Sequence, residues 1–367
     1  MITFNDQSII NLAEIFSAND HTSTTTGGQY SKDCTTLISQ KTGYKYAFLT
    51  PSCTSSIEIM SQFLFASGLT NVIVPSFTFT TSVIPFIDRG LKVTFCDVDP
   101  NTGCISPNEL KKVITSRHDA VLCVSYAGYL PHQEEISEIC KQNNCMFLQD
   151  DAQSIGNIGR NDEGMLPIAD FSALSFHYTK NISCGEGGAL LFNNSAFFDQ
   201  VTEIVNKGTN RHLFLKGQVE KYNWTSLGGS HLMSEVTAIV LLSQLSKIDV
   251  ITEYRRRIWD VYAQVLKDCV RFVHDRERST NGHIFGVLTR DASDQKLLIK
   301  FLKSKGVQAV EHYTDLSASP FSKKASIEKH CSGAREISSR IVRLPIGLHV
   351  TENEATRIAN FVKVYFE

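Results

Sequence analysis

The sequence predicts an α/β fold in which a mostly parallel sheet is flanked by helices and followed by a smaller α+β domain. Three observations support this prediction. The chain has 367 residues, more than the roughly 250–300 that one hydrophobic core usually holds. Short β-rich segments alternate with helical patterns from residue 45 to about residue 195. Several of these segments are continuously apolar, which is typical of strands buried on both faces of a parallel sheet.

Each predicted element of the large domain follows from hydrophobic periodicity and from the turn residues that bound it. β-branched and aromatic residues mark predicted strands at residues 45–49, 71–75, 92–98, 120–126, 144–149, 171–177 and 188–194. Amphipathic patterns predict helices at residues 56–67, 106–116 and 134–143, and a further helix near 195–207. Strands that alternate with helices in this way predict a sheet with helices on both faces.

A polar loop at residues 207–224 separates these elements from the second half of the chain. A long helical pattern at about residues 234–268 follows and is expected to lead out of the large domain. Beyond it, residues 283–289 and 308–313 are predicted strands, and residues 294–305 and 352–366 are predicted helices. We therefore place a large domain at residues 1–245 and a small C-terminal domain at residues 246–367, although no Pro- or Gly-rich linker marks the boundary.

Composition and charge narrow the functional classes. Hydrophobic residues make up 42% and charged residues 20% of the chain, the balance of a globular protein rather than a disordered or coiled-coil one. The net charge of −2 lacks the basic excess of a nucleic-acid-binding protein, so we expect no such partner. No stretch approaches the ~20 apolar residues of a membrane span, and no signal peptide is evident. The ten cysteines show no CxxC pair or zinc-type spacing, so we expect reduced thiols, a cytoplasmic location and no metal site.

The first segment that could carry chemistry is TPSCTSSIEIMSQFL at residues 50–64, in which small hydroxyl residues stand between a predicted strand and a predicted helix. Ser and Thr cap helix N-termini, where free N–H groups and the helix dipole also attract anions. Thr54 and Ser55 are therefore candidate phosphate ligands. An ordinary cap that needs no ligand explains the same residues, so this segment alone leaves both interpretations open.

The second segment, MFLQDDAQS at residues 146–154, places Asp150, Asp151 and Gln153 at the end of a strand. In open α/β sheets the carboxyl ends of the strands line the ligand crevice. A buried Asp at this place can pair with a cationic ring nitrogen. A helix or turn cap is the alternative interpretation.

The third segment, SALSFHYTKNISCGEGGALLF at residues 172–192, places Lys180 after a strand and before a Gly-rich turn. Partial desolvation would make this amine a candidate Schiff-base lysine, whereas a lysine taken at random is usually a solvated charge. His177 is interpreted as a hydrogen-bonded structural histidine rather than a metal ligand. The chain has no HExxH, no GxGxxG after a strand and no GxxxxGK[ST], so zincin, Rossmann and P-loop interpretations lack their main signals.

Together, the three segments match the needs of pyridoxal phosphate (PLP). A helix N-terminus would anchor the phosphate, and Asp150 would keep the pyridine nitrogen protonated so that the ring acts as an electron sink. Lys180 would hold the aldehyde as an imine and move the proton. Each feature has an ordinary structural explanation, but their combination predicts a PLP enzyme.

The sequence also resembles the sugar-nucleotide branch of the fold type I PLP aminotransferases, over nearly the whole chain from about residue 25 to the C-terminus. The segments that carry the resemblance are TPSCTSS, VPSFTFTTS, DDAQSIG, SFHYTKN with GEGGAL, and KGTNRHLFLKGQVEKYNW. The TPSCT element and the last segment are similar to the dTDP-4-amino-4,6-dideoxygalactose transaminase group and related dTDP-4-keto-6-deoxyglucose 4-aminotransferases. The resemblance implies a fold type I enzyme with PLP and with active sites shared between two chains.

Carried over position by position, the resemblance implies a set of site residues. Lys180 matches the Schiff-base lysine, and Asp150 matches the partner of the pyridine nitrogen. The other implied cofactor contacts are Thr54, Ser55 and Ser175 to the phosphate, Phe79 on the ring, Gln153 to the ring hydroxyl and Ser230 to the phosphate of the neighbouring subunit. The implied substrate residues are Lys207, Arg211, Lys216, Lys221, Tyr222 and Trp224. Cations suit a diphosphate, and aromatic rings suit a base or a sugar face.

Some positions depart from the pattern of the family. The departures are Gln149 for an acid, Asp151 for a small residue, Cys53 for a Gly, Leu232 for an Arg and Ser230 for an Asn. Lys180, Asp150 and Gln153 are intact, so the expected chemistry stands. The lysine argues against the related PLP-dependent sugar dehydratases, which carry a histidine at that place.

We therefore expect a cytoplasmic homodimer that uses glutamate to convert a dTDP-4-keto-6-deoxyhexose to a dTDP-4-amino-4,6-dideoxyhexose (gluco or galacto). PLP would alternate with its pyridoxamine phosphate form, and the product would enter a surface polysaccharide such as an O-antigen. Amination at C3 of a dTDP-3-keto-6-deoxyhexose and amination of a UDP-linked keto sugar stay open as alternatives. Two other classes are a catalytically silent sugar-nucleotide-binding regulator, against which intact Lys180 and Asp150 argue, and an NAD-binding oxidoreductase or epimerase, whose Gly-rich fingerprint is absent.

Overall fold

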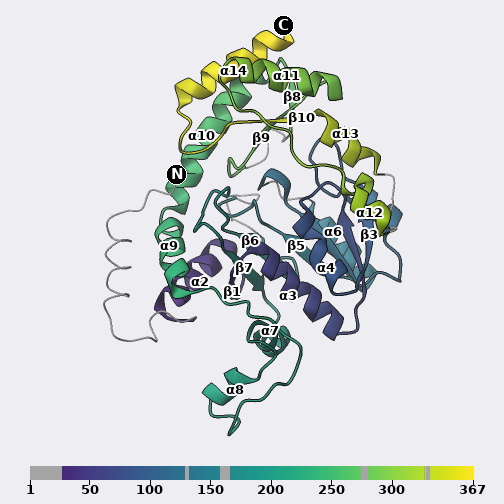
Figure 1. Cartoon of the computed structure of the whole chain (residues 1–367), viewed down its shortest axis with the longest axis vertical. Helices are drawn as coiled ribbons and strands as arrows, with labels where there is room; N and C mark the ends of the chain where they lie inside the picture. Colours follow the sequence, from purple (N-terminus) through teal and green to yellow (C-terminus); the bar gives the residue numbers. More distant parts are fainter. Residues whose placement is uncertain (1–26, 129–131, 158–165, 274–279, 326, 328–330) are drawn as a thin grey trace.

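The computed structural model describes residues 27–128, 132–157, 166–273, 280–325, 327 and 331–367. A seven-stranded sheet forms the large domain, and a three-stranded sheet forms the centre of a smaller C-terminal unit. In Figure 1 the smaller sheet and its helices lie at one end of the molecule, and α8 (Arg211–Leu215) projects at the other.

The large sheet has the strand order β1-β7-β6-β5-β4-β2-β3. Its strands are β1 (Tyr46–Thr50), β2 (Asn71–Pro75), β3 (Lys92–Cys96), β4 (Ala120–Val124), β5 (Met146–Asp150), β6 (Phe171–Ser175) and β7 (Gly188–Phe192). Strands β3, β2, β4, β5 and β6 are parallel, whereas β7 runs antiparallel to both β6 and β1. Every residue of β4, β6 and β7 is buried, which explains their apolar sequences. The predicted mostly parallel sheet is confirmed.

Helices cover both faces of the large sheet. Along β7, Leu190 and Phe192 belong to the cluster that includes α3, whereas Ala189 and Leu191 belong to the cluster that includes α2 and α9. Successive strand residues point to opposite faces, so the two helix layers enclose the sheet. The helices are α2 (Gln29–Thr42), α3 (Cys53–Ala66), α4 (Ile84–Asp88), α5 (Pro107–Val113), α6 (Gln133–Gln142), α7 (Phe198–Val205) and α9 (Glu235–Leu245), with the short 3₁₀ turns η2 (Thr80–Ser82), η3 (Tyr126–Gly128) and η5 (Ser195–Phe197).

The smaller unit has its own core. Trp259, Tyr262 and Phe285 pack with buried residues of α14, and α10 and α14 run against each other. Its sheet has the order β10-β9-β8 and is antiparallel. The elements are α10 (Ile248–Leu266), β8 (Arg271–Phe272), β9 (Phe285–Leu288), α11 (Ala292–Ser304), η6 (Leu316–Ala318), α12 (Pro320–Lys324), α13 (Ser332–Arg340), β10 (Ile341–Leu344) and α14 (Glu352–Phe366). The domain boundary at residue 245, the last residue of α9, stays a prediction.

Two predicted elements of the second half are wrong. Residues 308–313 form no strand, since Val310 makes only an isolated bridge with Arg343. The strands beside β9 are instead β8 and β10, neither of which was predicted. The helical pattern at residues 234–268 is two helices rather than one, because α9 ends at Leu245 and Lys247 has a non-helical backbone (φ −113°, ψ 10°) before α10 begins. In the described ranges, no helix is long and apolar enough to cross a membrane.

Candidate active site

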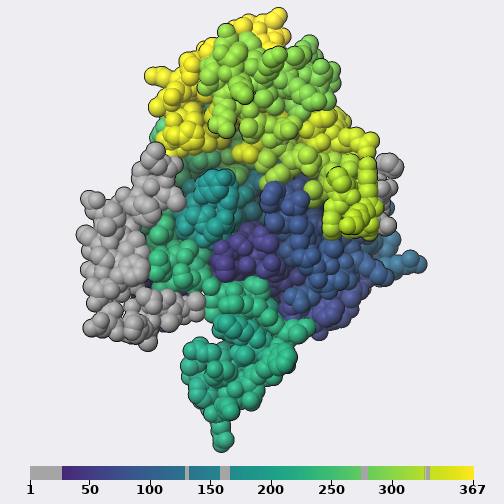
Figure 2. All heavy atoms as spheres, viewed as in Figure 1, coloured from purple at the N-terminus to yellow at the C-terminus, as the bar shows by residue number. Residues whose placement is uncertain are grey.

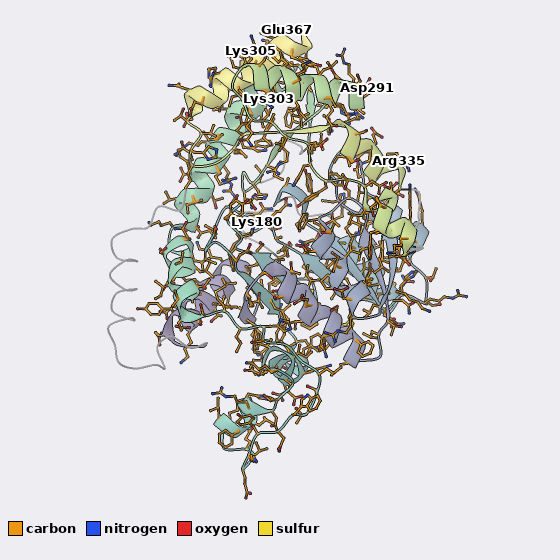
Figure 3. The ribbon with its side chains drawn as sticks, viewed as in Figure 1. Lys180, Asp291, Lys303, Lys305, Arg335 and Glu367 are labelled. Carbon is orange, nitrogen blue, oxygen red and sulfur yellow. The ribbon has the colours of Figure 1, made fainter. Side chains whose placement is uncertain are left out.

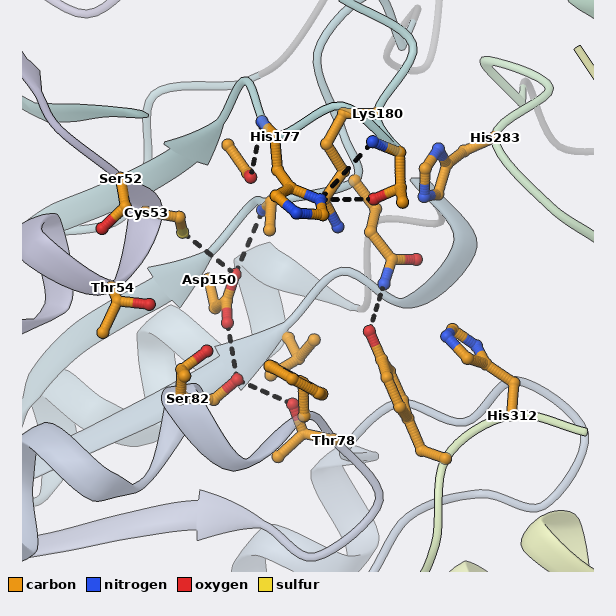
Figure 4. A pocket seen from close by; sticks show the side chains of 18 of the residues that line it. Ser52, Cys53, Thr54, Thr78, Ser82, Asp150, His177, Lys180, His283 and His312 are labelled. Carbon is orange, nitrogen blue, oxygen red and sulfur yellow. Dashed lines mark hydrogen bonds between the residues drawn. The ribbon is translucent and has the colours of Figure 1, made fainter. Parts of the chain in front are cut away.

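A pocket of about 470 Å³ opens between the two sheets. Figure 3 shows Lys180 in the middle of the molecule, between the two domains, and Figure 4 shows the pocket from close by. The pocket is lined from the large domain by Ser52, Cys53, Thr54, Thr78, Phe79, Thr81, Ser82, Val124, Asp150, Ala152, Gln153, Ser175, His177, Thr179, Lys180 and Glu186, and from the smaller unit by His283, His312, Tyr313 and Arg343.

Sheet topology brings these residues together. Val124, Asp150 and Ser175 are the last residues of β4, β5 and β6, three neighbouring parallel strands. Parallel strands end on the same edge of a sheet, where open α/β proteins bind their ligands. The start of α3 packs closely against this edge at Gly188. A side chain there would clash, since a Cβ at that position would lie 2.5 Å from the backbone nitrogen of Cys53. The pocket therefore follows from the strand order and from one close backbone approach.

Asp150 is a buried carboxylate held by two donors. The Ser82 hydroxyl donates to Oδ2 at 2.7 Å, and the backbone N–H of Ala152 donates to Oδ1 at 3.1 Å. The Cys53 thiol lies 3.8 Å from Oδ1, and burial raises the pKa of this thiol well above its ordinary value. Cys53 therefore stays a neutral thiol beside the Asp150 carboxylate.

Lys180 enters the pocket from the loop between β6 and β7. Its backbone N–H donates to the carbonyl of His177 at 2.9 Å, which shapes the turn that carries it. Burial lowers the pKa of the Lys180 amine, and the negative charge of Asp150 opposes part of that effect. A lysine with a lowered pKa offers a neutral amine more readily than a solvated lysine does, as Schiff-base chemistry requires.

The Gln153 side chain is fixed at both ends. Its oxygen accepts from the backbone N–H of Ala127 at 2.6 Å, and its nitrogen donates to the Tyr313 hydroxyl at 3.1 Å. Tyr313 stacks on His312 with ring centroids 3.7 Å apart, and the hydroxyl of Tyr126 lies 2.9 Å from His312 Nδ1. These contacts join the carboxyl edge of the large sheet to the smaller unit.

Most of the predicted cofactor residues gather in this pocket. Thr54, Phe79, Asp150, Gln153, Ser175 and Lys180 all line it. Ser55 does not: it lies in the first turn of α3, where its backbone N–H donates to the Ser52 side chain at 3.1 Å. The structure places Ser230 elsewhere, in an isolated bridge with Asn206.

The predicted substrate residues lie outside the pocket, on the arm formed by residues 207–224 (Lys207, Arg211, Lys216, Lys221, Tyr222 and Trp224). Figure 2 shows the arm as a projection from the body of the molecule. Its base is closed by hydrogen bonds from Lys207 N–H to Gly229 O at 3.0 Å and from Asn210 N–H to Asn223 O at 3.2 Å. Within one chain, the arm therefore does not meet the pocket.

Sequence reasoning missed the pocket residues of the smaller unit. The Nδ1 atom of His283 lies 2.9 Å from Oδ1 of Asn181. Arg343 is a residue of strand β10. The segment IVRLP has one charged residue inside an apolar run, and this pattern is the sequence feature that could have indicated Arg343 as a candidate site residue. The contact between His177 Nε2 and Glu186 Oε1, 3.3 Å apart in the pocket lining, was also missed.

Comparison with known families decides what kind of protein carries this pocket. The model of the DegT/DnrJ/EryC1/StrS aminotransferase family matches residues 8–363. The chain belongs to this family. It is a PLP-dependent transaminase that acts on sugar nucleotides, as predicted from the sequence.

Three curated relatives of this DegT/DnrJ/EryC1/StrS family member show the range of similar enzymes. A UDP-4-amino-4,6-dideoxy-N-acetyl-beta-L-altrosamine transaminase from Helicobacter pylori is 25% identical over 89% of this chain and 87% of its own. A dTDP-4-amino-4,6-dideoxy-D-glucose transaminase from Shigella dysenteriae is also 25% identical, over 88% and 86%. A GDP-perosamine synthase from Escherichia coli O157:H7 is 24% identical over 95% and 93%.

Solved structures confirm the fold. The aminotransferase PseC of Helicobacter pylori, involved in the biosynthesis of pseudaminic acid, superposes with a TM-score of 0.89 at 21% identity, covering 99% of this chain and 97% of its own. The sugar aminotransferase Spr1654 from Streptococcus pneumoniae, solved in its PLP-form, has a TM-score of 0.88 at 18% identity and covers 99% and 96%. The chain thus has the PLP fold type I architecture predicted from its sequence.

The pocket fits the cofactor that the family membership implies. PLP needs an amine, an acidic partner for its ring nitrogen and donors for its phosphate. A half-buried lysine whose amine has a lowered pKa, a buried carboxylate and the hydroxyl-rich start of a helix face one cavity here. PLP is therefore the cofactor of this enzyme, as the sequence predicted.

Proposed function

We propose that this transaminase moves the amino group of glutamate to C4 of a dTDP-4-keto-6-deoxyhexose and forms a dTDP-4-amino-4,6-dideoxyhexose. The observation that carries the proposal is the Lys180 amine with its lowered pKa, which shares one pocket with the Asp150 carboxylate at the carboxyl edge of the sheet. Both the gluco and the galacto product are compatible with this proposal.

The proposed roles follow from the position of each group. When bound, PLP supplies an aldehyde that exchanges amino groups and a ring that takes up electrons from the reacting carbon. Asp150 would hold a proton on the ring nitrogen, and Lys180 Nζ would bind the aldehyde and then carry the proton of the donor's α-carbon. Thr54 and Ser175 would bind the phosphate with the N–H groups at the start of α3, helped by Ser55. Phe79 would cover the ring, and Gln153 would donate to its hydroxyl.

The sugar part of the proposal has support from the relatives. The Helicobacter pylori and Shigella dysenteriae enzymes, equally similar to this chain, both carry a 4-amino-4,6-dideoxy sugar in their names. Amination at C4 of a 6-deoxy sugar is common to both, whereas the nucleotide is UDP in one and dTDP in the other. The choice of dTDP rests on the resemblance through KGTNR and GQVEKYNW. The alternatives are a UDP-linked keto sugar and a C3 keto group.

The proposal includes a homodimer in which the arm of each chain completes the pocket of its partner. The arm exposes apolar side chains to solvent, with Leu215 64%, Tyr222 47% and Trp224 78% exposed. Large apolar groups on a projection are typical of an interface. Lys207, Arg211, Lys216 and Lys221 would then face the diphosphate, Tyr222 and Trp224 the base or sugar, and Ser230 the cofactor phosphate of the partner. The enzyme would act in the cytoplasm and supply an amino sugar for a surface polysaccharide such as an O-antigen.

The nucleotide is tested by comparing kcat/KM for dTDP-4-keto-6-deoxyglucose with that for a UDP-linked N-acetylated 4-keto-6-deoxy sugar, with glutamate in both assays. We expect the dTDP sugar to be preferred by at least about 10-fold, the effect of roughly 1.4 kcal/mol of differential transition-state binding. A preference for the UDP sugar would overturn the choice of dTDP and leave the transaminase assignment intact.

A further inference from the structure

Asp151 is a buried carboxylate to which the roles above give no task. It follows Asp150 directly, at the carboxyl end of β5. The hydroxyls of Ser125 and Ser172 each donate to the Asp151 carboxylate at 2.6 Å, and the Gln149 amide donates to it at 2.9 Å. These donors come from β5, from β6 and from the residue after β4, so the carboxylate ties three neighbouring strands together.

The Asp151 side chain lies on the opposite face of the sheet from Asp150. Asp151 accepts from Ser172, which shares its face of β6 with Leu174 and not with Ala173. Leu174 belongs to the cluster that includes α2 and α9, whereas Ala173 belongs to the cluster that includes α3. Asp150 instead lines the pocket, as Figure 4 shows. Asp151 therefore stands behind Asp150, on the far side of the sheet from the start of α3.

No cation neutralises the charge of Asp151 in the part of the chain that the structure describes. Within those residues, no lysine, arginine or histidine nitrogen lies at ion-pair distance from its carboxylate. Burial raises the pKa of Asp151 from 3.8 to about 6, so the group is ionised at neutral pH and above. A buried charge without a counter-ion costs folding free energy, and an asparagine would fill the same space without that cost. The charge of Asp151, rather than its hydrogen bonds, therefore needs an explanation.

The charge of Asp151 is felt in the pocket. Burial, Asp150 and Asp151 all raise the pKa of the Cys53 thiol, which lines the pocket. The other titratable groups near Asp151 are the Tyr44 hydroxyl and the Cys123 thiol, and burial raises the pKa of both, so they stay neutral. Asp151 is therefore the group of this cluster whose charge changes near pH 6.

Gln149 and Asp151 form a hydrogen-bonded pair that flanks Asp150. Both positions depart from the family pattern, since Gln149 replaces an acid and Asp151 a small residue. The acid of this chain thus stands two residues later, on the same face and in contact with the same hydroxyl, because Gln149 donates to Ser125 at 2.8 Å and Ser125 donates to Asp151. The cluster holds one amide and one carboxylate, and either residue is placed to carry the charge.

We propose that Asp151 is a positioning residue whose negative charge helps Asp150 to hold the proton on the pyridine nitrogen of PLP. This inference rests on the role proposed above for Asp150. A negative charge behind Asp150 favours the protonated, cationic form of the ring nitrogen, and the sheet between them has a lower dielectric constant than water. Two carboxylates, one at the ring nitrogen and one behind it, therefore act on the same proton.

The test follows the ring nitrogen itself. The apoenzyme of each variant is loaded with PLP that carries ¹⁵N in its ring, and the NMR shift of this nitrogen is titrated with pH. Asp151→Asn should release the ring proton at a pH about one unit lower than wild type, and Asp150→Asn at a still lower pH. Asp170→Asn is the matched control, because it removes a half-buried carboxylate just before β6, at the opposite edge of the sheet. It should leave the titration unchanged.

A rescue variant separates charge from packing. In the double variant with Gln149→Glu and Asp151→Asn, the acid and the amide exchange places within the same cluster, and the ring nitrogen should titrate closer to wild type than in Asp151→Asn alone. The rate of the glutamate half-reaction, followed by the cofactor's absorbance, should be about 10-fold lower in Asp151→Asn than in wild type at pH 8. The two rates should converge at pH 5, where Asp151 of the wild type is itself neutral.

The outcomes distinguish this inference from the role of Asp150. An unchanged ring nitrogen in Asp151→Asn, or a loss of rate that is equal at pH 5 and pH 8, would overturn the inference while a shift in Asp150→Asn upholds the role of Asp150. No shift in Asp150→Asn would overturn that role, and this inference with it. If Asp151→Asn does not fold, Asp151→Ser, which also removes the charge, is titrated in its place.

Discussion

At the residue scale, the fold gives Lys180 the property that its proposed role needs. The lysine is carried by a short turn after β6 into a pocket where burial lowers the pKa of its amine. A solvated lysine is almost wholly charged at neutral pH and cannot attack an aldehyde. The local sequence and the burial thus give Lys180 an amine that suits the proposed nucleophilic role.

Lys180→Ala should abolish turnover, with a loss of at least the ~10²–10⁴-fold that a positioned proton-transfer group contributes. The variant should also lose the absorbance of PLP joined to a lysine, because no other lysine lines the described pocket. Lys303→Ala is the matched control, since Lys303 is exposed on α11 (Figure 3). Near wild-type activity in Lys180→Ala would show that the catalytic amine lies elsewhere.

Asp150→Asn should keep the fold and lower kcat/KM by at least about 10²-fold, because a neutral amide cannot stabilise a protonated pyridine nitrogen. Ser82→Ala provides the comparison: it removes the 2.7 Å hydrogen bond to Asp150 but keeps the carboxylate charge, and we expect a much smaller loss. Steady-state kinetics with melting temperatures distinguish the two variants. Equal losses in both would mean that Asp150 matters through its hydrogen bonds and not through its charge.

Asp151 should make the stability of the enzyme depend on pH. Its buried carboxylate accepts from Ser125 and Ser172 at 2.6 Å and from Gln149 at 2.9 Å, yet burial raises its pKa from 3.8 to about 6. Because the pKa is raised in the folded state, the folded protein binds more protons than the unfolded chain between these values. The free energy of unfolding therefore falls as pH rises through this window, by about 2 kcal/mol between pH 4.5 and pH 7.

Urea unfolding of wild type and Asp151→Asn across that pH range measures this effect. The stability of wild type relative to the variant should decrease as pH rises, because asparagine does not titrate. A relative stability that is constant, or that increases with pH, would contradict the raised pKa.

Sequence reasoning located the large-domain half of the pocket and missed the other half. Asp150 ends a strand, Thr54 lies in the first turn of a helix and Lys180 lies in the loop after a strand, so local patterns and the rule for strand ends predict their meeting. Arg343, His312 and Tyr313 reach the same cavity from more than 100 residues further along the chain. Their approach depends on how the smaller sheet packs against the large one, which no local pattern encodes.

At the scale of elements, the errors in the predicted strands of the smaller unit have local causes. Residues 308–313 combine β-branched and aromatic side chains, but His312 and Tyr313 turn to the pocket and leave one bridge at Val310. The true strand β10 has only four residues, follows α13 without a turn residue and contains a charge. At residues 308–313 packing at the pocket overrides a strand pattern, whereas β10 is a strand that its local pattern does not mark.

The proposed role of the arm in homodimer formation can be tested separately from catalysis. Trp224→Ser should weaken homodimer formation at least about 10-fold, since a large aromatic residue often dominates an interface. Sedimentation of serially diluted enzyme measures the dissociation constant, and Leu297→Ser, an exposed leucine of α11, is the matched control. The isolated chain should keep its melting temperature, because Trp224 is 78% exposed. A fully active monomer at assay concentration would refute the shared active site.

At the scale of the whole molecule, the large sheet and the smaller unit enclose one pocket. The large sheet brings the amine and the acid, and the smaller unit brings His283, His312, Tyr313 and Arg343. Residues from both sheets' surroundings therefore line one pocket. The sugar nucleotide, on our proposal, meets a third surface, the partner's arm.

The transfer of nitrogen from glutamate to the sugar is the most direct test of the central proposal. The enzyme is incubated with PLP, ¹⁵N-glutamate and dTDP-4-keto-6-deoxyglucose, and the product is examined by NMR. We predict ¹⁵N bonded to C4 of the dTDP sugar, one equivalent of 2-oxoglutarate per product, and no transfer by Lys180→Ala. Nitrogen on C3, or no nitrogen on the sugar while the enzyme is loaded with PLP, would contradict the proposal.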